Sequence, residues 1–318
     1  MVAHLTRLLL LLQGLVAFAI ALAAHSRLHL GWPLAIIFGA GVILLVRMAI
    51  TANNFFIARH YCGPLAKEVR LSWTEWLRLY LNEFKSTMYC SSWAMPFLAF
   101  SARPAFDPAS LPVLLIHGYG CNSGYWHGMS KALTAAHITH HAINLEPVFG
   151  DIDDYIPPLR AAVNALCEET GHEKVILVAH SMGGLAARAY LRAEGETRIA
   201  KVITLGSPHQ GTGLAKFGIG QNSRQMRWTG KAHEGQASDW LCRLQASEDA
   251  QRRACFVSIY SLHDNIIAPP TSSILAGAKN IAFPAIGHVA LAYAPEIQEC
   301  VIREILATDA GMESSLSA

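Results

Sequence analysis

The stretch KVILVAHSMGGLAARAYLRAE, residues 174–194, decides the fold. Its first six residues form a continuous apolar run, which is typical of a strand buried on both faces of a sheet. After Ser181 and two glycines, apolar residues recur at helical spacing. A strand that turns sharply into a helix needs small residues two positions before and after the serine at the turn, here Ala179 and Gly183. We therefore expect the Ser181 hydroxyl to lie at a helix N-terminus, where the helix dipole favours a nucleophilic anion.

The same alternation of strands and helices extends on both sides of this stretch. Because continuous apolar strands separated by helices favour a parallel sheet covered on both faces, we predict an α/β domain over 111–310. Residues 208–240 are rich in Gly, Ser and Gln and predict a long loop or a small cap. The expected strands are 112–116, 139–145, 174–179, 201–205, 255–260 and 280–284, and the expected helices are 126–136, 153–169, 183–194 and 295–306.

A serine nucleophile needs a general base, and the base needs an acid to orient it. Asp264 follows the run CFVSIY, and His288 follows the run NIAFPAI. The carboxyl ends of parallel strands meet at one edge of a sheet, so both residues are expected beside Ser181. His263 is expected to point elsewhere. The competing acids are Glu234, Asp239 and Asp249.

Two backbone N–H groups are expected to form an oxyanion hole, which binds the negative charge that develops on an attacked carbonyl. One belongs to Met182, directly after the nucleophile. The other belongs to Tyr119, in the loop IHGYGCN that follows the first strand of the domain. The run HGYG is also explained as a tight turn between a strand and a helix. This is compatible with an oxyanion hole, because such a turn exposes the backbone N–H group.

The motifs LLIHGYG, VAHSMGG, TLGSPHQGT, DNIIAPP and GAKNIAFPAIGHVALAY together resemble the alpha/beta-hydrolase lipases, in particular small bacterial triacylglycerol lipases and esterases with an AHSMGG elbow. The resemblance covers about 111–306 and implies hydrolysis of carboxylic esters through an acyl-enzyme, without an organic cofactor. It implies Ser181 as nucleophile, Asp264 as acid, His288 as base, and Tyr119 and Met182 as oxyanion donors. Some larger bacterial lipases bind a structural calcium, but no acidic cluster supports a metal site here.

The expected substrate is a lipid or another acyl ester. Met226, Trp228, Trp240 and Leu241 are candidates for an acyl pocket or for closing the cap over the core. His209, in the run SPHQGT, either approaches the substrate or supports its loop. A thioesterase, a phospholipase and an acyltransferase are alternatives with the same site. An inactive membrane scaffold is an alternative of another class, although no position of the triad is degenerate.

The first 50 residues are predicted to form two transmembrane helices. The runs 8–24 and 33–50 carry only one charged residue, Arg47, which is expected to reach the lipid interface. Basic residues outside this hairpin outnumber those in its loop, which contains Arg27 alone; the outer ones are Arg7, Arg47, Arg59, Lys67 and Arg70. The positive-inside rule then predicts a bacterial inner-membrane protein with a cytoplasmic catalytic domain. The alternative is a secretory signal that is cleaved near Ala23.

Residues 51–110 are predicted to be a connector with one amphipathic helix. Its apolar stripe either packs on the domain or lies on the bilayer, and consists of Val69, Trp73, Trp76, Leu77, Tyr80, Leu81 and Phe84. Over the whole chain, 52% hydrophobic and 15% charged residues exclude disorder, and a net charge of +2 does not indicate a nucleic-acid partner. The 7 cysteines are expected to be free thiols, with a Cys242–Cys255 bridge as the alternative. The sequence does not indicate an oligomeric state.

Overall fold

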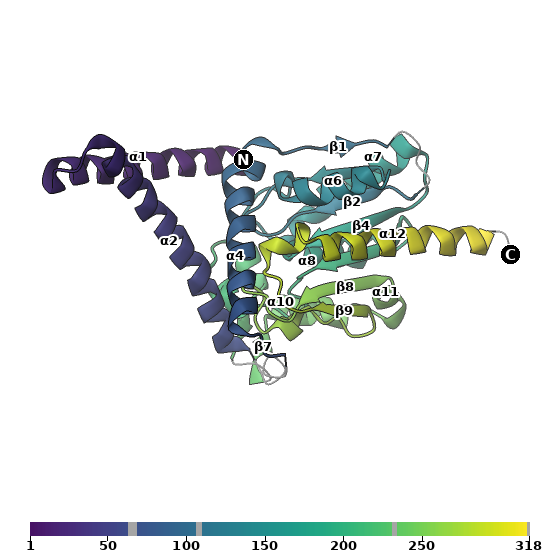
Figure 1. The fold of residues 1–318 in the computed structure, drawn as a ribbon. Coiled ribbons are helices and arrows are strands. Elements are labelled where there is room, and N and C mark those ends of the chain that lie inside the picture. The colour runs from purple at the N-terminus through teal and green to yellow at the C-terminus, as the bar shows by residue number, and fades with distance from the viewer. Residues whose placement is uncertain (63–68, 106–109, 231–233, 317–318) are drawn as a thin grey trace.

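The computed structural model describes residues 1–62, 69–105, 110–230 and 234–316. At its centre lies a 7-stranded sheet with the strand order β1-β3-β2-β4-β5-β8-β9 (Figure 1). Every neighbouring pair in this described sheet is parallel except β1 and β3. The six predicted strands are confirmed, whereas the short edge strand β1 was not predicted. The strands are β1 Ala102–Arg103, β2 Val113–Ile116, β3 His140–Ile143, β4 Val175–His180, β5 Ile199–Leu205, β8 Phe256–Ser261 and β9 Lys279–Phe283.

Helices cover both faces of the sheet. Because neighbouring side chains of a strand point to opposite faces, Val113 and Leu115 of β2 join one core, and Leu114 and Ile116 join the other. The first core contains α6 His127–Ala135 and α12 Pro295–Leu316. The second contains α7 Ile156–Thr170 and α8 Met182–Glu194. This double covering explains why the strands are continuous apolar runs.

The segment after β5, which was predicted as a long loop or a small cap, contains short elements and is called the cap below. It consists of η4 Gly213–Phe217, α9 Gln221–Gln225, the paired strands β6 Trp228–Thr229 and β7 Gln236–Ala237, and α10 Asp239–Ala246, followed by α11 Ala250–Ala254. Short 3-10 turns also connect the larger elements: η2 Ser123–Trp126, η3 Ile152–Tyr155, η6 Pro270–Ser273 and η7 Val289–Ala292. Cys242 and Cys255 are both free, so the alternative of a bridge between them is wrong.

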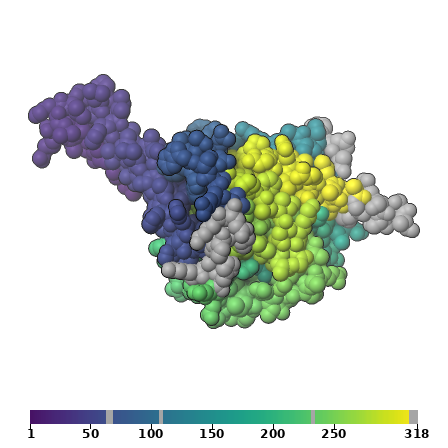
Figure 2. Space-filling model, turned by 60° about the horizontal axis from the view of Figure 1, so that its bottom comes forward, coloured from purple at the N-terminus to yellow at the C-terminus, as the bar shows by residue number. Residues whose placement is uncertain are grey.

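The N-terminal helices α1 Val2–Leu28 and α2 Trp32–Tyr61 form an arm that projects from the globular body (Figures 1 and 2). Small residues allow close contact between them, because a Cβ added at Gly39 would lie 2.2 Å from the Ala17 carbonyl oxygen. Both helices are long and apolar enough to cross a bilayer, and only 11% and 17% of their most apolar windows are buried. Ala23, the alternative cleavage site, lies inside the continuous helix α1.

Both outer ends of the arm return to the globular body. The Met1 ammonium donates to Glu146 Oε1 over 2.7 Å, and α2 ends beside η4. The sequence predicts that Arg47 extends from α2 to the lipid interface. In the structure, Arg47 binds to the connector instead. Its guanidinium donates to the hydroxyls of Ser91 and Ser92 in η1 Cys90–Ala94, a π-helical turn. Lys67, which was counted in the charge bias, lies outside the described residues.

The connector contains α4 Trp73–Tyr89, followed by η1 and α5 Met95–Phe97. Ser72 and Glu75 begin α4 with a capping box. The helix packs on the domain through Leu79 and Glu83, which are buried, and through the adjacent edge of its apolar stripe, where the ring centroid of Trp76 lies 5.8 Å from that of His263. The other edge of the stripe faces outward, with Trp73 81% exposed and Leu77 and Leu81 also exposed.

Candidate functional site

Ser181 lies in the turn between β4 and α8 with φ 54° and ψ −126°, a conformation that an L-residue rarely adopts. The turn needs glycines, because the backbone after β2 and the Ser207 side chain lie directly against it. A Cβ added at Gly183 would lie 2.5 Å from the Ile116 carbonyl oxygen, and one added at Gly184 would lie 2.1 Å from Ser207 Oγ. The tight packing of β4, α8 and β2 therefore holds Ser181 at the carboxyl edge of the sheet.

Asp264 and His288 meet at the same edge, as the sequence predicted for the loops after β8 and β9. Asp264 Oδ2 accepts a hydrogen bond from His288 Nδ1 over 2.8 Å, and both side chains are buried. The other carboxylate oxygen, Oδ1, accepts from the backbone N–H groups of Ile266 and Ile267, each over 2.8 Å. These three bonds fix the carboxylate. They also place the proton of the imidazole on Nδ1, which leaves Nε2 as an acceptor.

Gly206 provides the space for this pair. Its φ is +53°, and a Cβ added there would lie 3.1 Å from Asp264 Oδ2 and 3.3 Å from His288 Nδ1. His180, the residue before the serine, packs on the other side with its ring centroid 4.4 Å from that of His288. Burial lowers the pKa of His180 well below its usual value, so a neutral ring separates the pair from the core. His263 points away, as expected, toward the Val69 carbonyl oxygen.

The loop after β2 directs the Tyr119 N–H group. The Gly118 carbonyl accepts hydrogen bonds from His117 Nδ1 over 2.9 Å and from the Cys121 N–H group over 3.3 Å. In a trans peptide, the N–H of the next residue points opposite to this carbonyl. His117 Nε2 accepts from the Leu145 N–H group, and burial lowers the pKa of His117 to about 4, so the ring is neutral and keeps this tautomer.

The two predicted oxyanion donors both flank Ser181. Met182 is the first residue of α8, and a Cβ added at Gly118 would lie 2.8 Å from Ser181 Cβ. Within the described part of the chain, neither the Met182 nor the Tyr119 N–H group donates to a backbone carbonyl. Two free donors beside a serine are suited to binding a negatively charged oxygen.

A buried carboxylate that sequence reasoning missed holds the histidine loop. Glu83 of α4 accepts hydrogen bonds from the Val289 and Ala290 N–H groups, each over 3.0 Å. These are the first two residues of η7, whose N-cap is His288. Burial raises the pKa of Glu83, while the two N–H donors and His288 oppose that shift. The only signal in the sequence was an acidic residue next to the apolar stripe of a helix, which usually marks a solvated face.

Ser181 lines a cavity of about 430 Å³. Of the four residues predicted for an acyl pocket, Met226 lines this cavity and the other three do not. Leu241 lies in the core, Trp240 donates its indole N–H to Asp153, and Trp228 packs beside Ala58, Tyr61 and Ala268. Trp240 and Leu241 therefore pack the cap on the core, as the other interpretation has it, whereas Trp228 packs against the end of α2.

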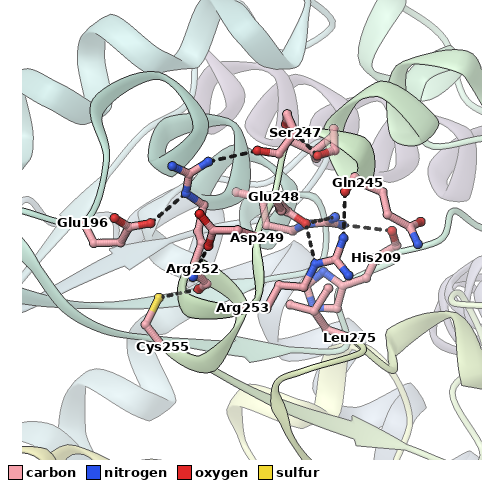
Figure 3. Close-up of polar contacts among 12 residues, drawn as sticks. Glu196, His209, Gln245, Ser247, Glu248, Asp249, Arg252, Arg253, Cys255 and Leu275 are labelled. Carbon is pink, nitrogen blue, oxygen red and sulfur yellow. Dashed lines mark hydrogen bonds and ion pairs between the residues drawn. The ribbon is translucent and has the colours of Figure 1, made fainter.

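His209 supports its loop and does not approach the cavity. Its side chain is buried against Thr204, and its backbone carbonyl accepts a hydrogen bond from Arg188 of α8 over 2.9 Å. Arg188 also forms two hydrogen bonds of 2.7 Å to Glu248. Glu248 in turn contacts Arg253 (Figure 3). This buried network ties the helix after Ser181 to the loop after β5 and to the segment between α10 and α11.

Comparison with known proteins agrees with this architecture. Residues 112–229 match the family model of the alpha/beta hydrolase fold. A lipase of Bacillus licheniformis in its mature form superposes with a TM-score of 0.53 at 20% identity, over 65% of this chain and 97% of that one. The globular domain has the alpha/beta-hydrolase fold.

Two bacterial relatives match part of this alpha/beta-hydrolase domain. Triacylglycerol lipase of Burkholderia plantarii is 32% identical over 124 residues, which are 36% of this chain and 34% of the relative. Triacylglycerol lipase of Pseudarthrobacter phenanthrenivorans is 32% identical over 114 residues, which are 33% and 35% of the two chains. The match thus spans about a third of the length of each relative. The resemblance to bacterial lipases that the motifs implied is confirmed.

Proposed function

We propose that the protein is a membrane-anchored serine hydrolase that cleaves carboxylic esters of acyl lipids. The observation that carries the proposal is the 2.8 Å hydrogen bond between His288 and Asp264 at the sheet edge that also holds the strained Ser181. Both triacylglycerol lipase relatives support the choice of a carboxylic ester as substrate.

In the proposed reaction, His288 Nε2 takes the proton of the Ser181 hydroxyl while Oγ attacks the ester carbonyl carbon. The N–H groups of Tyr119 and Met182 bind the oxyanion of the tetrahedral intermediate. His288 then gives its proton to the leaving alcohol, and an acyl-enzyme remains on Ser181. The histidine next takes a proton from water, whose oxygen attacks the acyl carbon, and returns that proton to Ser181 as the acid leaves. Asp264 stabilises the imidazolium in both steps.

The anchor in this proposal is the hairpin of α1 and α2. Their exposed apolar side chains would be costly in water but not in lipid, and each helix satisfies its own backbone hydrogen bonds. Both ends of the hairpin contact the globular body, which favours a single side of the membrane for both. With the bias of basic residues toward the outer flanks, we propose the cytoplasmic side of a bacterial inner membrane.

Detergent-solubilised protein tests the chemistry through hydrolysis of nitrophenyl esters and covalent labelling by a fluorophosphonate. Replacement S181A is expected to lower turnover at least ~10³-fold and to abolish labelling, because the nucleophile is lost. Membrane fractions washed with carbonate test the anchor, since a spanning hairpin should remain in the pellet. If the S181A protein were still fully labelled, Ser181 would not be the nucleophile. If carbonate released the protein from the membrane, α1 and α2 would not form a spanning hairpin.

A further inference from the structure

The cavity at Ser181 has a wall that comes from the N-terminal arm. Three residues near the C-terminal end of α2 line it together with the serine: Asn53, Asn54 and Ile57. Its volume of about 430 Å³ lies within the range of small-molecule sites. The arm is therefore part of the candidate site as well as a candidate anchor.

Close packing fixes this end of α2 on the domain. Ala58 and Tyr61 are buried in one cluster with Ala268, from the loop after β8. A Cβ added at Gly213 of η4 would lie 2.5 Å from the Tyr61 ring, so the ring lies directly on the cap backbone. The wall cannot move away without opening this contact.

Both polar and apolar residues line the cavity. Asn53 is exposed and Asn54 is half-buried, and within the described residues neither carboxamide has a hydrogen-bond partner. Apolar side chains supply most of the remaining lining; they are Leu214, Ala215, Phe217, Met226, Ile266 and Ile267. Such a site matches an amphiphile whose ester lies between a polar group and an alkyl chain.

The surface beside the cavity has the composition of a lipid interface. Phe56 is 77% exposed, and Phe217 and Ile219 are each 62% exposed. Lys216 lies over the rings of Tyr61 and Phe217, at 5.4 and 4.8 Å from the ring centroids. Exposed aromatic and aliphatic groups beside cations are typical of segments at the headgroup level. From this point α2 continues toward its own exposed apolar run.

We propose that α2 forms one wall of the substrate site and guides a long-chain acyl ester from the bilayer to Ser181. This inference rests on the proposed hydrolase. The alkyl chain packs between Ile57 and the other apolar residues of the cavity, and the carboxamides of Asn53 and Asn54 bind the polar part of the lipid. The substrate therefore comes from the membrane that holds the arm and not from water.

Labelling of Ser181 by fluorophosphonates with short and long alkyl chains tests the wall. In this reaction Oγ bonds to phosphorus, fluoride leaves, and the serine proton passes to His288. Full-length protein in phosphatidylcholine vesicles is compared with the variants N54W and I57W, in which an indole fills the cavity. The ratio of the long-chain to the short-chain labelling rate is expected to fall at least about tenfold.

The control is A52W, which places the same bulk at an exposed position of α2 that does not line the cavity, and should keep the ratio of the unaltered protein. I57A removes bulk and should shift the chain-length optimum to longer chains, which keeps the test valid if a tryptophan variant does not fold. Three outcomes would contradict the proposal that α2 forms a wall of the substrate site. They are an unchanged ratio of labelling rates in the two tryptophan variants, an equal fall of this ratio in A52W, and no shift of the chain-length optimum in I57A. If the unaltered protein is labelled by neither probe, the proposed hydrolase fails, and this inference fails with it.

The bilayer route is tested with a long-chain ester that exchanges slowly between vesicles. It is placed either in the vesicles that hold the protein or in separate vesicles mixed with them. Hydrolysis mainly of ester in the protein's own vesicles supports the route. Equal rates for the two placements would show delivery from outside and overturn it.

Discussion

The N-terminal arm and the α/β domain are both rich in apolar residues, yet they use them in opposite ways. In the domain, strands β2 and β4 are buried at every position, and their side chains enter the two cores. In the arm, many large apolar side chains of α1 and α2 point outward. The difference shows that hydrophobicity alone does not define a core. Neighbouring layers cover the apolar side chains of the domain, whereas those of the arm are left exposed, which fits the proposed location of the arm in lipid.

The largest expected effect lies in the domain and concerns the acid and base. H288A should lower turnover about as much as loss of the serine, at least ~10³-fold, since no other base replaces it. D264N should be less severe, because the imidazole remains although its orientation and charge are less well supported. Steady-state hydrolysis of a short ester measures both. If D239N abolished turnover and D264N left it unchanged, the acid of the triad would be Asp239 in the cap and not Asp264.

The second effect concerns the stability of the domain. R188A should lower the free energy of unfolding by about 3–5 kcal/mol, because it leaves the buried Glu248 carboxylate with a weaker partner and frees the His209 carbonyl. Chemical denaturation in detergent measures the loss. R252A is the matched control, since its pair with Glu196 is partly exposed and worth about 0–1 kcal/mol. An equal loss of unfolding free energy in the two variants would show that the buried network does not stabilise α8, the helix after Ser181.

The third effect tests whether the connector between arm and domain takes part in the chemistry. E83Q keeps one acceptor but turns an NH2 group toward the second N–H donor, so the loop that carries His288 should shift. We expect kcat to fall about 10- to 100-fold with little change of KM, because positioning is lost while the cavity remains. E75Q, an exposed change on the same helix, should leave both constants unaltered. A fall in E83Q stability without a fall in kcat would make Glu83 purely structural.

The smallest effect concerns pH. Burial lowers the pKa of His140 to about 4; in the core its Nδ1–H donates to the Ile138 carbonyl oxygen over 2.9 Å, and Nε2 of the neutral ring accepts from the Ser130 hydroxyl over 2.7 Å. Above about pH 6.5 the ring is neutral in both states, but at lower pH the unfolded chain takes up the proton first. Stability should therefore fall as pH drops from about 6.5 toward 4, by up to about 1.4 kcal/mol per pH unit for this group.

Thermal unfolding in detergent at about pH 7.5 and 5 measures this dependence. H140Q should show a shallower fall than the unaltered protein, and H60Q, at an exposed position of α2, should match the unaltered protein. If H140Q retains the full dependence, the other buried histidines account for it.

Local order was largely determined by the sequence. Continuous apolar runs, helical periodicity and the small residues around Ser181 depend on neighbours within a few positions, so they predicted the strands, the helices and the turn. The approach of Asp264 and His288 also followed, because parallel strands bring their carboxyl ends to one edge. The two apolar helices were equally evident, since length and composition alone make them candidates to cross a bilayer.

Only the tertiary structure decided which distant segments complete the site. Glu83 and Ile57 belong to helices whose sequence gives no sign of a partner more than a hundred residues away, yet one holds the histidine loop and the other lines the cavity at Ser181. Only one edge of the apolar stripe of α4 packs on the domain, through Trp76 against His263, and beside it the buried Glu83 accepts from two N–H groups that only the folded domain supplies. Periodicity shows that a helix has two faces, but the surface that each face meets depends on contacts between segments far apart in the chain.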